Sequence, residues 1–289
     1  MSKLTWELKI LQRRNHDGGR STQHNRKKIL IQIAKQLKEI GFNQMGIHSL
    51  KAKHTIKLVD KWKKEDLNPG TIKNRMAHLR WWASKVNATH KIPTNKQLGI
   101  AQRIYITNVD KSIVLKQEHL SRISDPFLKL SLRLQSEFGL RREESIKFIA
   151  AFADKGKSIS LKDTWCKGKR AREIPIITDS QRKLIDEIKR FTGDKSLIPQ
   201  DKMYKHQLNK YRNNVTKNII GFSKGHGLRH NYAQQRYKAL SGNNCPLQGG
   251  KHQRDMTNLE RNKDREVRLI ISEELGHSRE QITSSYLGS

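Results

Sequence analysis

Apolar side chains recur at three- and four-residue steps along much of the chain, a pattern that predicts a mainly helical protein. In the first third, this spacing predicts helices over residues 25–41, 55–64 and 71–86. The second of these helices is expected to bury Ile56, Leu58, Val59 and Trp62. A turn at Asn68-Pro69-Gly70 separates it from the third helix.

Periodicity is lost over residues 87–110, which include Pro93 and Gly99 and are interpreted as a linker between two domains. Beyond the linker, further helices are expected over residues 116–123, 126–138, 179–190, 203–219, 227–240 and 265–275. Between them, two short alternating segments, residues 158–163 and 171–177, flank Lys167-Gly168-Lys169. This arrangement predicts a small β-hairpin with a basic tip.

The predicted fold is therefore mainly α with one small β-sheet, divided into two domains. Residues 1–23 are polar and are expected to form an irregular N-terminal arm. Residues 24–105 would form a helical domain, and residues 106–289 a second, mixed domain. Within the second domain, the polar and basic residues 241–263 are interpreted as an insertion, either a solvated loop or a contact to a partner.

Charge identifies the class of partner. The 289 residues include 59 Lys and Arg but only 27 Asp and Glu, a formal net charge of +32. Such a charge favours polyanions, nucleic acid above all, although a solvated basic surface or a ribosome-associated protein would account for it equally well. No apolar run reaches the roughly 18 residues of a membrane span, and no signal peptide is visible. The cysteines, Cys166 and Cys245, suggest neither a disulfide framework nor a zinc site, so a reducing cytoplasm and no metal are expected.

Four fragments of the second domain combine residue types that suit phosphoryl transfer. They are Gly139-Leu140-Arg141 followed by Glu144, Lys167 eight residues before Pro175, His226-Gly227-Leu228-Arg229, and Leu275-Gly276-His277 followed by Tyr286. Each fragment alone is a weak signal. Their order, spacing and predicted setting together resemble the tyrosine recombinase (phage integrase) family, over residues 116–289.

The residue chemistry supports this resemblance. A tyrosine such as Tyr286 can hold a cut phosphodiester covalently and so conserve its energy. Two guanidinium groups, Arg141 and Arg229, can stabilise the pentacoordinate phosphate without a metal. Lys167 could protonate the departing 5′ oxygen, and His226 could take the phenolic proton.

Two further residues complete the expected site. His277 could donate a hydrogen bond to a non-bridging phosphate oxygen, and Glu144 is interpreted as a buried carboxylate that orients the basic cluster. His230 lies beside Arg229 but out of register, and is expected to be structural. For Tyr286, three residues from the end of the sequence, the competing interpretation is a loosely ordered aromatic.

The resemblance implies a site-specific recombinase or integrase of a mobile element or prophage, acting in the bacterial cytoplasm or nucleoid. Its core-binding and catalytic domains would form a clamp on double-stranded DNA, and a homotetramer would exchange strands through a 3′-phosphotyrosyl intermediate without a cofactor. The helix after Asn68 would correspond to a core-binding helix, with Lys73, Arg75, Arg80 and Lys85 as candidate DNA contacts. An accessory DNA-bending or directionality protein is a further expected partner.

Two features and three alternatives remain open. The interval from Arg229 to Leu275 is longer than in compact family members, and a helix that would dock on a neighbouring subunit is missing after Tyr286. The same chemistry also suits a type IB topoisomerase or a telomere resolvase. A catalytically silent DNA-binding or architectural protein is the alternative from a different class.

Overall fold

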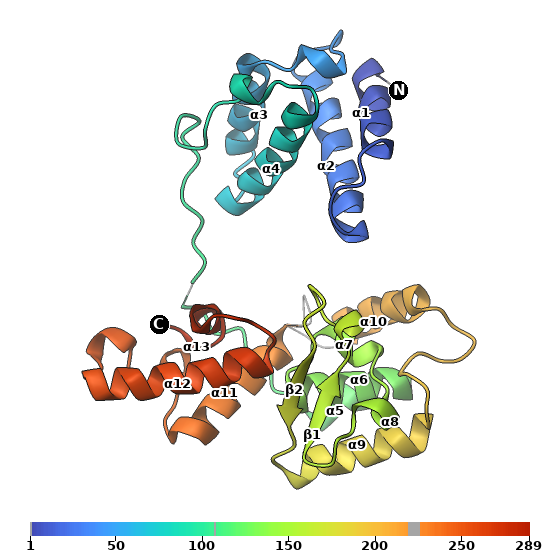
Figure 1. The fold of residues 1–289 in the computed structure, drawn as a ribbon, viewed down its shortest axis with the longest axis vertical. Coiled ribbons are helices and arrows are strands. Elements are labelled where there is room, and N and C mark those ends of the chain that lie inside the picture. Colours follow the sequence, from blue (N-terminus) through green and yellow to red (C-terminus); the bar gives the residue numbers. More distant parts are fainter. Residues whose placement is uncertain (1, 107, 219–225) are drawn as a thin grey trace. The chain divides into compact units, whose positions relative to one another are not determined.

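The structure is a computed structural model that describes residues 2–106, 108–218 and 226–289, with residues 216–218 described by their backbone alone. The chain divides into two compact units, Met1–Tyr105 and Ile106–Ser289 (Figure 1). The division falls where the sequence places its domain boundary. Each unit has its own hydrophobic core and is described by itself.

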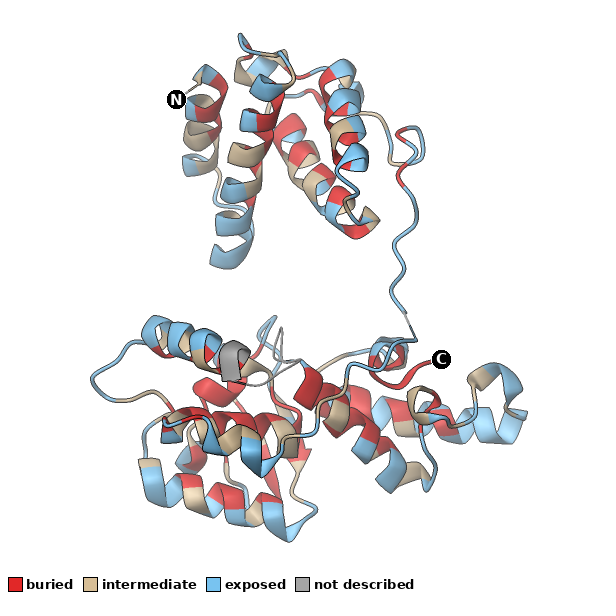
Figure 2. Ribbon diagram, turned by 180° about the vertical axis from the view of Figure 1, so that it is seen from behind, coloured by how far each residue is buried: buried red, intermediate tan, exposed pale blue. Residues whose placement is uncertain are grey.

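The first unit is a bundle of helices joined by short connections. Its helices are α1 (Lys3–Arg13), α2 (Arg20–Glu39), α3 (Ala52–Lys64) and α4 (Pro69–Lys85), with short 3-10 turns at Ile47–Ser49 and Thr89–Lys91. Asn68 caps α4 by accepting a hydrogen bond from the amide of Gly70, with Pro69 at the first helical position. The helices bury one stripe each, seen as the red faces of Figure 2, and Trp62 and Trp82 are fully buried among them.

The predicted irregular arm over residues 1–23 is wrong, because most of it is helical. Ser2 caps α1 through the amide of Thr5, and α1 buries Leu4 and Leu8 in the core of the first unit. The signal was present in the sequence as a capping serine followed by leucines four residues apart. The expected burial of Ile56 is also wrong, since 43% of this residue is exposed.

The second unit combines helices with a small sheet. Its helices are α5 (Gln117–Ser121), α6 (Pro126–Phe138), α7 (Arg142–Ile146), α8 (Ala150–Ala153), α9 (Asp179–Thr192), α10 (Tyr204–Asn218), α11 (Gly227–Ser241), α12 (Asn258–Glu274) and α13 (Ser284–Leu287). Short 3-10 turns lie at Asp163–Trp165, Pro246–Gln248, Gln253–Asp255 and Glu280–Thr283. The last residue of the helix predicted over 203–219, Ile219, lies outside the described residues.

The predicted hairpin is confirmed. Strands β1 (Ser158–Leu161) and β2 (Arg172–Pro175) pair antiparallel, with Ser158 opposite Pro175 and Leu161 opposite Arg172. The chain between the strands carries Lys167. The basic connection therefore projects from one end of the sheet, at the end where β2 begins.

Helix packing in the second unit positions the segments that carry the motifs. Helix α11 packs against α6, α12 and α13. Asp125 caps α6, Pro126 occupies its first position, and Gly139 ends it in the left-handed conformation with φ +61°. The end of α6 and the segment after α12 therefore meet beside α11, with Leu140 and Leu275 in one core.

The insertion over residues 241–263 is more ordered than a solvated loop. Helix α12 begins at Asn258, seven residues before the predicted start at 265, because Thr257 and Glu260 form a reciprocal capping box. The C-terminal residues lie against this insertion and against α12. Arg268 donates a hydrogen bond to the carbonyl of Gly288 at 2.9 Å, and a Cβ on Gly288 would lie 3.0 Å from Pro246.

Candidate active site

Arg141 and Glu144 form the first part of the site, at the start of α7. Glu144 is fully buried and accepts hydrogen bonds from the backbone amide of Arg141 at 2.7 Å and from its guanidinium at 2.8 Å. On its other side, the guanidinium of Arg172, the first residue of β2, donates to both carboxylate oxygens, at 3.0 and 2.7 Å. One carboxylate thus holds two arginines from different elements.

These contacts decide the charge state of Glu144. Burial alone would raise the pKa of its carboxyl, but the hydrogen bonds and charge of Arg172, together with the charge of Arg141, outweigh it. The pKa of Glu144 is lowered to about 2. The group is therefore an anion at neutral pH, and it orients arginines without exchanging protons.

Arg229, on the first turn of α11, is the most deeply buried cation of the site. Its guanidinium donates to the carbonyl of Gly139 at 2.5 Å and to the carbonyl of Leu275. Its Nε lies 3.3 Å from the phenol oxygen of Tyr286, and its Nη2 lies 3.3 Å from Nε2 of His277. The described partners of this guanidinium are thus two carbonyls, a phenol and an imidazole, so its charge has no carboxylate against it.

Burial lowers the pKa of Arg229 to about 10, with the charges of Arg141 and Arg172 acting in the same direction and Tyr286 opposing them. The group remains charged at neutral pH. Arg141, Arg172 and Arg229 therefore carry three positive charges against the single negative charge of Glu144. An excess of two positive charges at a largely desolvated site is suited to stabilising the negative charge of a phosphoryl-transfer transition state.

Tyr286 is held firmly and is not a loosely ordered aromatic. It lies on α13 with 8% of its surface exposed, and its carbonyl accepts a hydrogen bond from Gln234 of α11 at 3.2 Å. Its ring packs on that of His230, with centroids 4.7 Å apart, and its phenol oxygen lies 3.4 Å from Nε2 of His277. Helix packing therefore places the phenol between the guanidinium of Arg229 and the imidazole of His277.

Gly139 lets these groups come together. A Cβ at this position would lie 2.5 Å from Cδ1 of Tyr232 and 3.0 Å from a methyl of Leu275, and the backbone has the φ of +61° that favours glycine. The absence of a side chain brings the carbonyl of Gly139 to Arg229. The glycine of the Gly-Leu-Arg motif thus has a steric reason.

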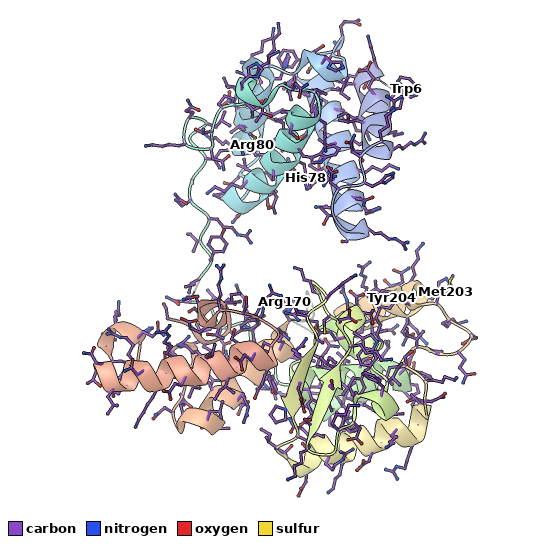
Figure 3. All side chains as sticks on the ribbon, in the orientation of Figure 1. Trp6, His78, Arg80, Arg170, Met203 and Tyr204 are labelled. Atoms are coloured by element: carbon purple, nitrogen blue, oxygen red, sulfur yellow. The ribbon has the colours of Figure 1, made fainter. Side chains whose placement is uncertain are left out.

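The two predicted histidines differ in their surroundings. Burial and the charges of Arg229 and Arg141 lower the pKa of His277 to about 4, so its ring is neutral at neutral pH. His226 immediately precedes α11, and partial loss of solvent and the charge of Arg229 lower its pKa as well. The charge of Lys167 also lowers the pKa of His226. Lys167 itself is exposed on the connection from which Arg170 projects in Figure 3.

The structure thus brings five predicted site residues into two clusters, Arg141 with Glu144 and Arg229 with His277 and Tyr286. Within the described part of the chain, no three His, Cys, Asp or Glu side chains gather as metal ligands. None of the described helices is long and apolar enough to cross a membrane.

Comparison with known proteins identifies the family. The sequence matches the family described as "Phage integrase, N-terminal" over residues 1–89 and the family described as "Integrase" over residues 106–235. The chain belongs to the phage integrase family. It is a tyrosine recombinase, an enzyme that cuts and rejoins DNA. Among curated proteins, none matches it significantly.

Solved tyrosine recombinases share the fold of this recombinase at low sequence identity. A lambda integrase dimer bound to a core site is 15% identical, with a TM-score of 0.63 over 98% of this chain and 94% of that one. The Tn1549 transposon integrase in complex with transposon right end DNA is 13% identical, with a TM-score of 0.57 over 99% and 94% of the two chains. XerH recombinase in a post-cleavage complex with difH is 13% identical, with a TM-score of 0.60 over 98% and 80%.

In the first unit, three of the four candidate DNA contacts on α4 have partners within the unit. Arg80 donates to the carbonyl of Pro93 at 3.0 Å and to the side chain of Asn95 at 2.9 Å, and so fastens the segment that follows the helix. Lys85 forms an ion pair with Asp17 at 2.9 Å, and the guanidinium of Arg75 lies over the ring of Trp62. In this structure Arg80 supports the fold, and Lys73 is half-buried on the same helix. That the four residues contact DNA stays a prediction.

Arg172 is the site residue that the sequence analysis missed. It shares the hairpin with Lys167, Lys169 and Arg170, and only tertiary contact with Glu144 distinguishes it from them. Its side chain is 6% exposed. One signal was available: within the alternating pattern of the predicted second strand, Arg172 lies two residues from the buried Ile174 and so on the inner face.

The low pKa of His277 predicts that this group causes no loss of activity near pH 6.5. Because its folded pKa is about 4, the ring stays neutral as the pH falls from 8 to 5.5. We expect His277→Gln to slow covalent cleavage by about 10²-fold throughout this range. The measurement is the second-order rate constant of protein–DNA adduct formation, whose pH dependence reports the pKa values of groups in the free enzyme. A ratio of wild-type to variant rates that collapses below pH 6.5 would contradict the prediction.

Proposed function

We propose that this recombinase integrates or excises a mobile element or prophage, and that Tyr286 is its nucleophile. The observation that carries the proposal is the contact of the Tyr286 phenol with the buried guanidinium of Arg229, which has no carboxylate partner among the described residues. A guanidinium so placed stabilises negative charge that forms beside the phenol oxygen. The DNA-bound integrases of the same fold support the choice of substrate.

In the proposed reaction, the phenol oxygen of Tyr286 attacks the scissile phosphorus and forms a 3′-phosphotyrosyl bond. The bond from phosphorus to the 5′ oxygen breaks, and its electron pair leaves with that oxygen. Arg141 and Arg229 hold the non-bridging oxygens. Lys167 gives the 5′ oxygen a proton, and rejoining reverses each step.

The geometry suggests a division of roles between the histidines that differs from the one expected from the sequence. Nε2 of His277 lies 3.4 Å from the phenol oxygen, so we assign it as the acceptor of the phenol proton. A bound phosphate would offset the arginine charges that lower its pKa, and so make it a stronger base when substrate is present. His226, at the start of α11, is then assigned to a non-bridging oxygen.

For assembly, we propose that the two units close on opposite sides of duplex DNA and that four protomers bring two sites together. The tetramer of lambda integrase bound to a Holliday junction, at 14% identity and a TM-score of 0.62, supports this arrangement. A directionality or DNA-bending protein is proposed as an accessory factor, and the bacterial cytoplasm or nucleoid as the place of action.

A suicide substrate tests the proposed function. Duplexes from the ends of the element that carries this reading frame, nicked beside the cleavage position, release a short fragment and trap the covalent adduct. We expect an adduct that survives denaturant with the wild-type chain and is absent with Tyr286→Phe. DNA binding without an adduct on any such duplex would favour the silent DNA-binding protein, and relaxation of supercoils without strand exchange would favour a type IB topoisomerase.

In the first unit, we propose a DNA-backbone contact between the end of α1 and the start of α2. A hollow of about 340 Å³ lies there, and the described residues that line it include no carboxylate. Its basic lining residues are Lys9, Arg13, His16, Arg20, His24, Arg26 and Lys27. In contrast, a hollow of about 630 Å³ between α2 and α3 mixes lysines with Asp60 and Glu65. A lining of basic and neutral side chains favours the first hollow as the phosphate-binding surface.

The salt dependence of DNA binding tests this proposal. We expect Arg13→Gln with Lys27→Gln to make the slope of log K against log salt less steep by up to about 0.9 for each phosphate that is no longer neutralised. The matched control is Lys57→Gln with Lys64→Gln, which removes the same charge from the mixed hollow and should change the slope less. Equal changes from both pairs would show that the hollow has no special role.

A further inference from the structure

Arg172 touches three separate segments of the second unit with one side chain. Its Nη1 and Nη2 donate to Glu144 at 3.0 and 2.7 Å, and its Nε donates to the carbonyl of Glu274 at 2.8 Å. Its Nη1 also lies 3.4 Å from the sulfur of Cys166. With 6% of the side chain exposed, these contacts are shielded from water.

Each of these contacts lies beside a different residue of the proposed machinery. Glu144 holds Arg141. Glu274 ends α12, three residues before His277. Cys166 directly precedes Lys167. The guanidinium of Arg172 thus links the segments that carry the two cationic groups and the imidazole.

The connection that bears Lys167 is held by a backbone hydrogen bond at its base, next to Cys166, and its tip is exposed. The amide of Lys169 donates to the carbonyl of Cys166 at 3.2 Å, and Gly168 and Lys169 both have positive φ, at +76° and +53°. The chain therefore turns back tightly between Cys166 and Arg172. Because the tip side chains are exposed, the reach of Lys167 depends on where this base is fixed.

We propose that Arg172 is a positioning residue that holds the base of the connection against Glu144 and the end of α12, so that Lys167 reaches the departing 5′ oxygen. This inference rests on the proposed function. Arginine is required because its planar fork spans both oxygens of Glu144 while its Nε reaches the carbonyl of Glu274. A lysine at this position keeps the charge and loses the fixed geometry.

A substrate with a sulfur in place of the bridging 5′ oxygen tests the proposal. A thiolate leaves without a proton, since thiols ionise near pH 8.5 whereas an alcohol must be protonated. Lys167→Ala should therefore be slow on the oxygen substrate and recover on sulfur. We expect Arg172→Gln and Arg172→Lys to cleave the oxygen substrate about 10²-fold more slowly than wild type and to recover on sulfur in the same way.

The controls separate this role from others. Lys169→Ala removes a charge from the same connection and should cleave both substrates as wild type does. Arg172 variants that stay slow on sulfur, or that match wild type on oxygen, overturn the inference. If Arg172→Gln unfolds below the assay temperature, the rates of Arg172→Lys on the two substrates decide the test. If Lys167→Ala does not recover on sulfur, Lys167 is not the proton donor and the inference fails with it. If wild type forms no adduct on either substrate, the proposed function itself fails.

Discussion

Arg229→Lys is expected to slow covalent cleavage by at least about 10³-fold while leaving duplex affinity nearly unchanged. The lysine keeps one positive charge, but it cannot at once donate to the carbonyls of Gly139 and Leu275 and to the phenol of Tyr286. Affinity for the duplex should persist because a chain of net charge +32 has many other basic side chains that can bind the DNA phosphates. Adduct formation on the nicked duplex and a binding titration at fixed salt measure the two quantities.

The matched control for this prediction is Arg236→Lys, two turns along α11. Arg236 is also largely buried, but its partner is the carboxylate of Glu274 at 2.9 Å. This variant should lose stability and keep most of its cleavage rate. A rate for Arg229→Lys within tenfold of wild type, with an unchanged melting temperature, would remove Arg229 from the proposed machinery.

Glu144→Gln is expected to have the largest effect on stability, lowering the free energy of unfolding by about 3–5 kcal/mol. The substitution leaves the guanidinium groups of Arg141 and Arg172 without their shared anion at a buried position. Urea unfolding of wild type and variant measures the difference. The control is Glu143→Gln on the same helix, where an exposed pair with Lys147 should cost less than about 1 kcal/mol.

The same carboxylate predicts a pH dependence with a defined sign. Its folded pKa of about 2 lies below the ordinary value of 4.5. The unfolded chain therefore binds the proton first as the pH falls, and the stability from Glu144 is complete above about pH 5 and lost between pH 4.5 and 2. Glu144→Gln should show a smaller loss over that window. If the free energy of unfolding falls with pH equally in wild type and variant down to pH 2, the assigned ion pairs are contradicted.

The sequence predicted most helices and the hairpin, because their periodicity and turn residues are local signals. The prediction was wrong where the helical signal was short and the segment around it was interpreted from its polar composition. Helix α1 was hidden in a polar segment, although Ser2, Leu4 and Leu8 specify it. Helix α12 starts at a capping box, Thr257 with Glu260, that lies in the stretch interpreted as an insertion.

For the candidate site, spacing within each motif identified residues but could not assign their partners. That Glu144 binds Arg172 as well as Arg141, and that Nε2 of His277 contacts the phenol oxygen, depends on how α7, α12 and α13 pack. The same holds for the α4 cations, since the contacts of Arg80 with Pro93 and Asn95 arise from a turn of the chain after the helix. Such contacts bring together segments whose separation along the chain carries no periodic signal.

The hydroxyl of Tyr286, proposed as the nucleophile, and the guanidinium of Arg229 lie beside each other within one polypeptide. The C-terminal residues that carry this hydroxyl are held on the same chain by hydrogen bonds from Arg268 and Gln234. A mixture of two inactive variants, one altered at Tyr286 and the other at Arg229, should therefore not regain activity, because neither chain carries both groups. In a cell that expresses both an intact and a Tyr286→Phe copy, every mixed complex would contain idle positions. A defect of this kind would be inherited as a dominant one.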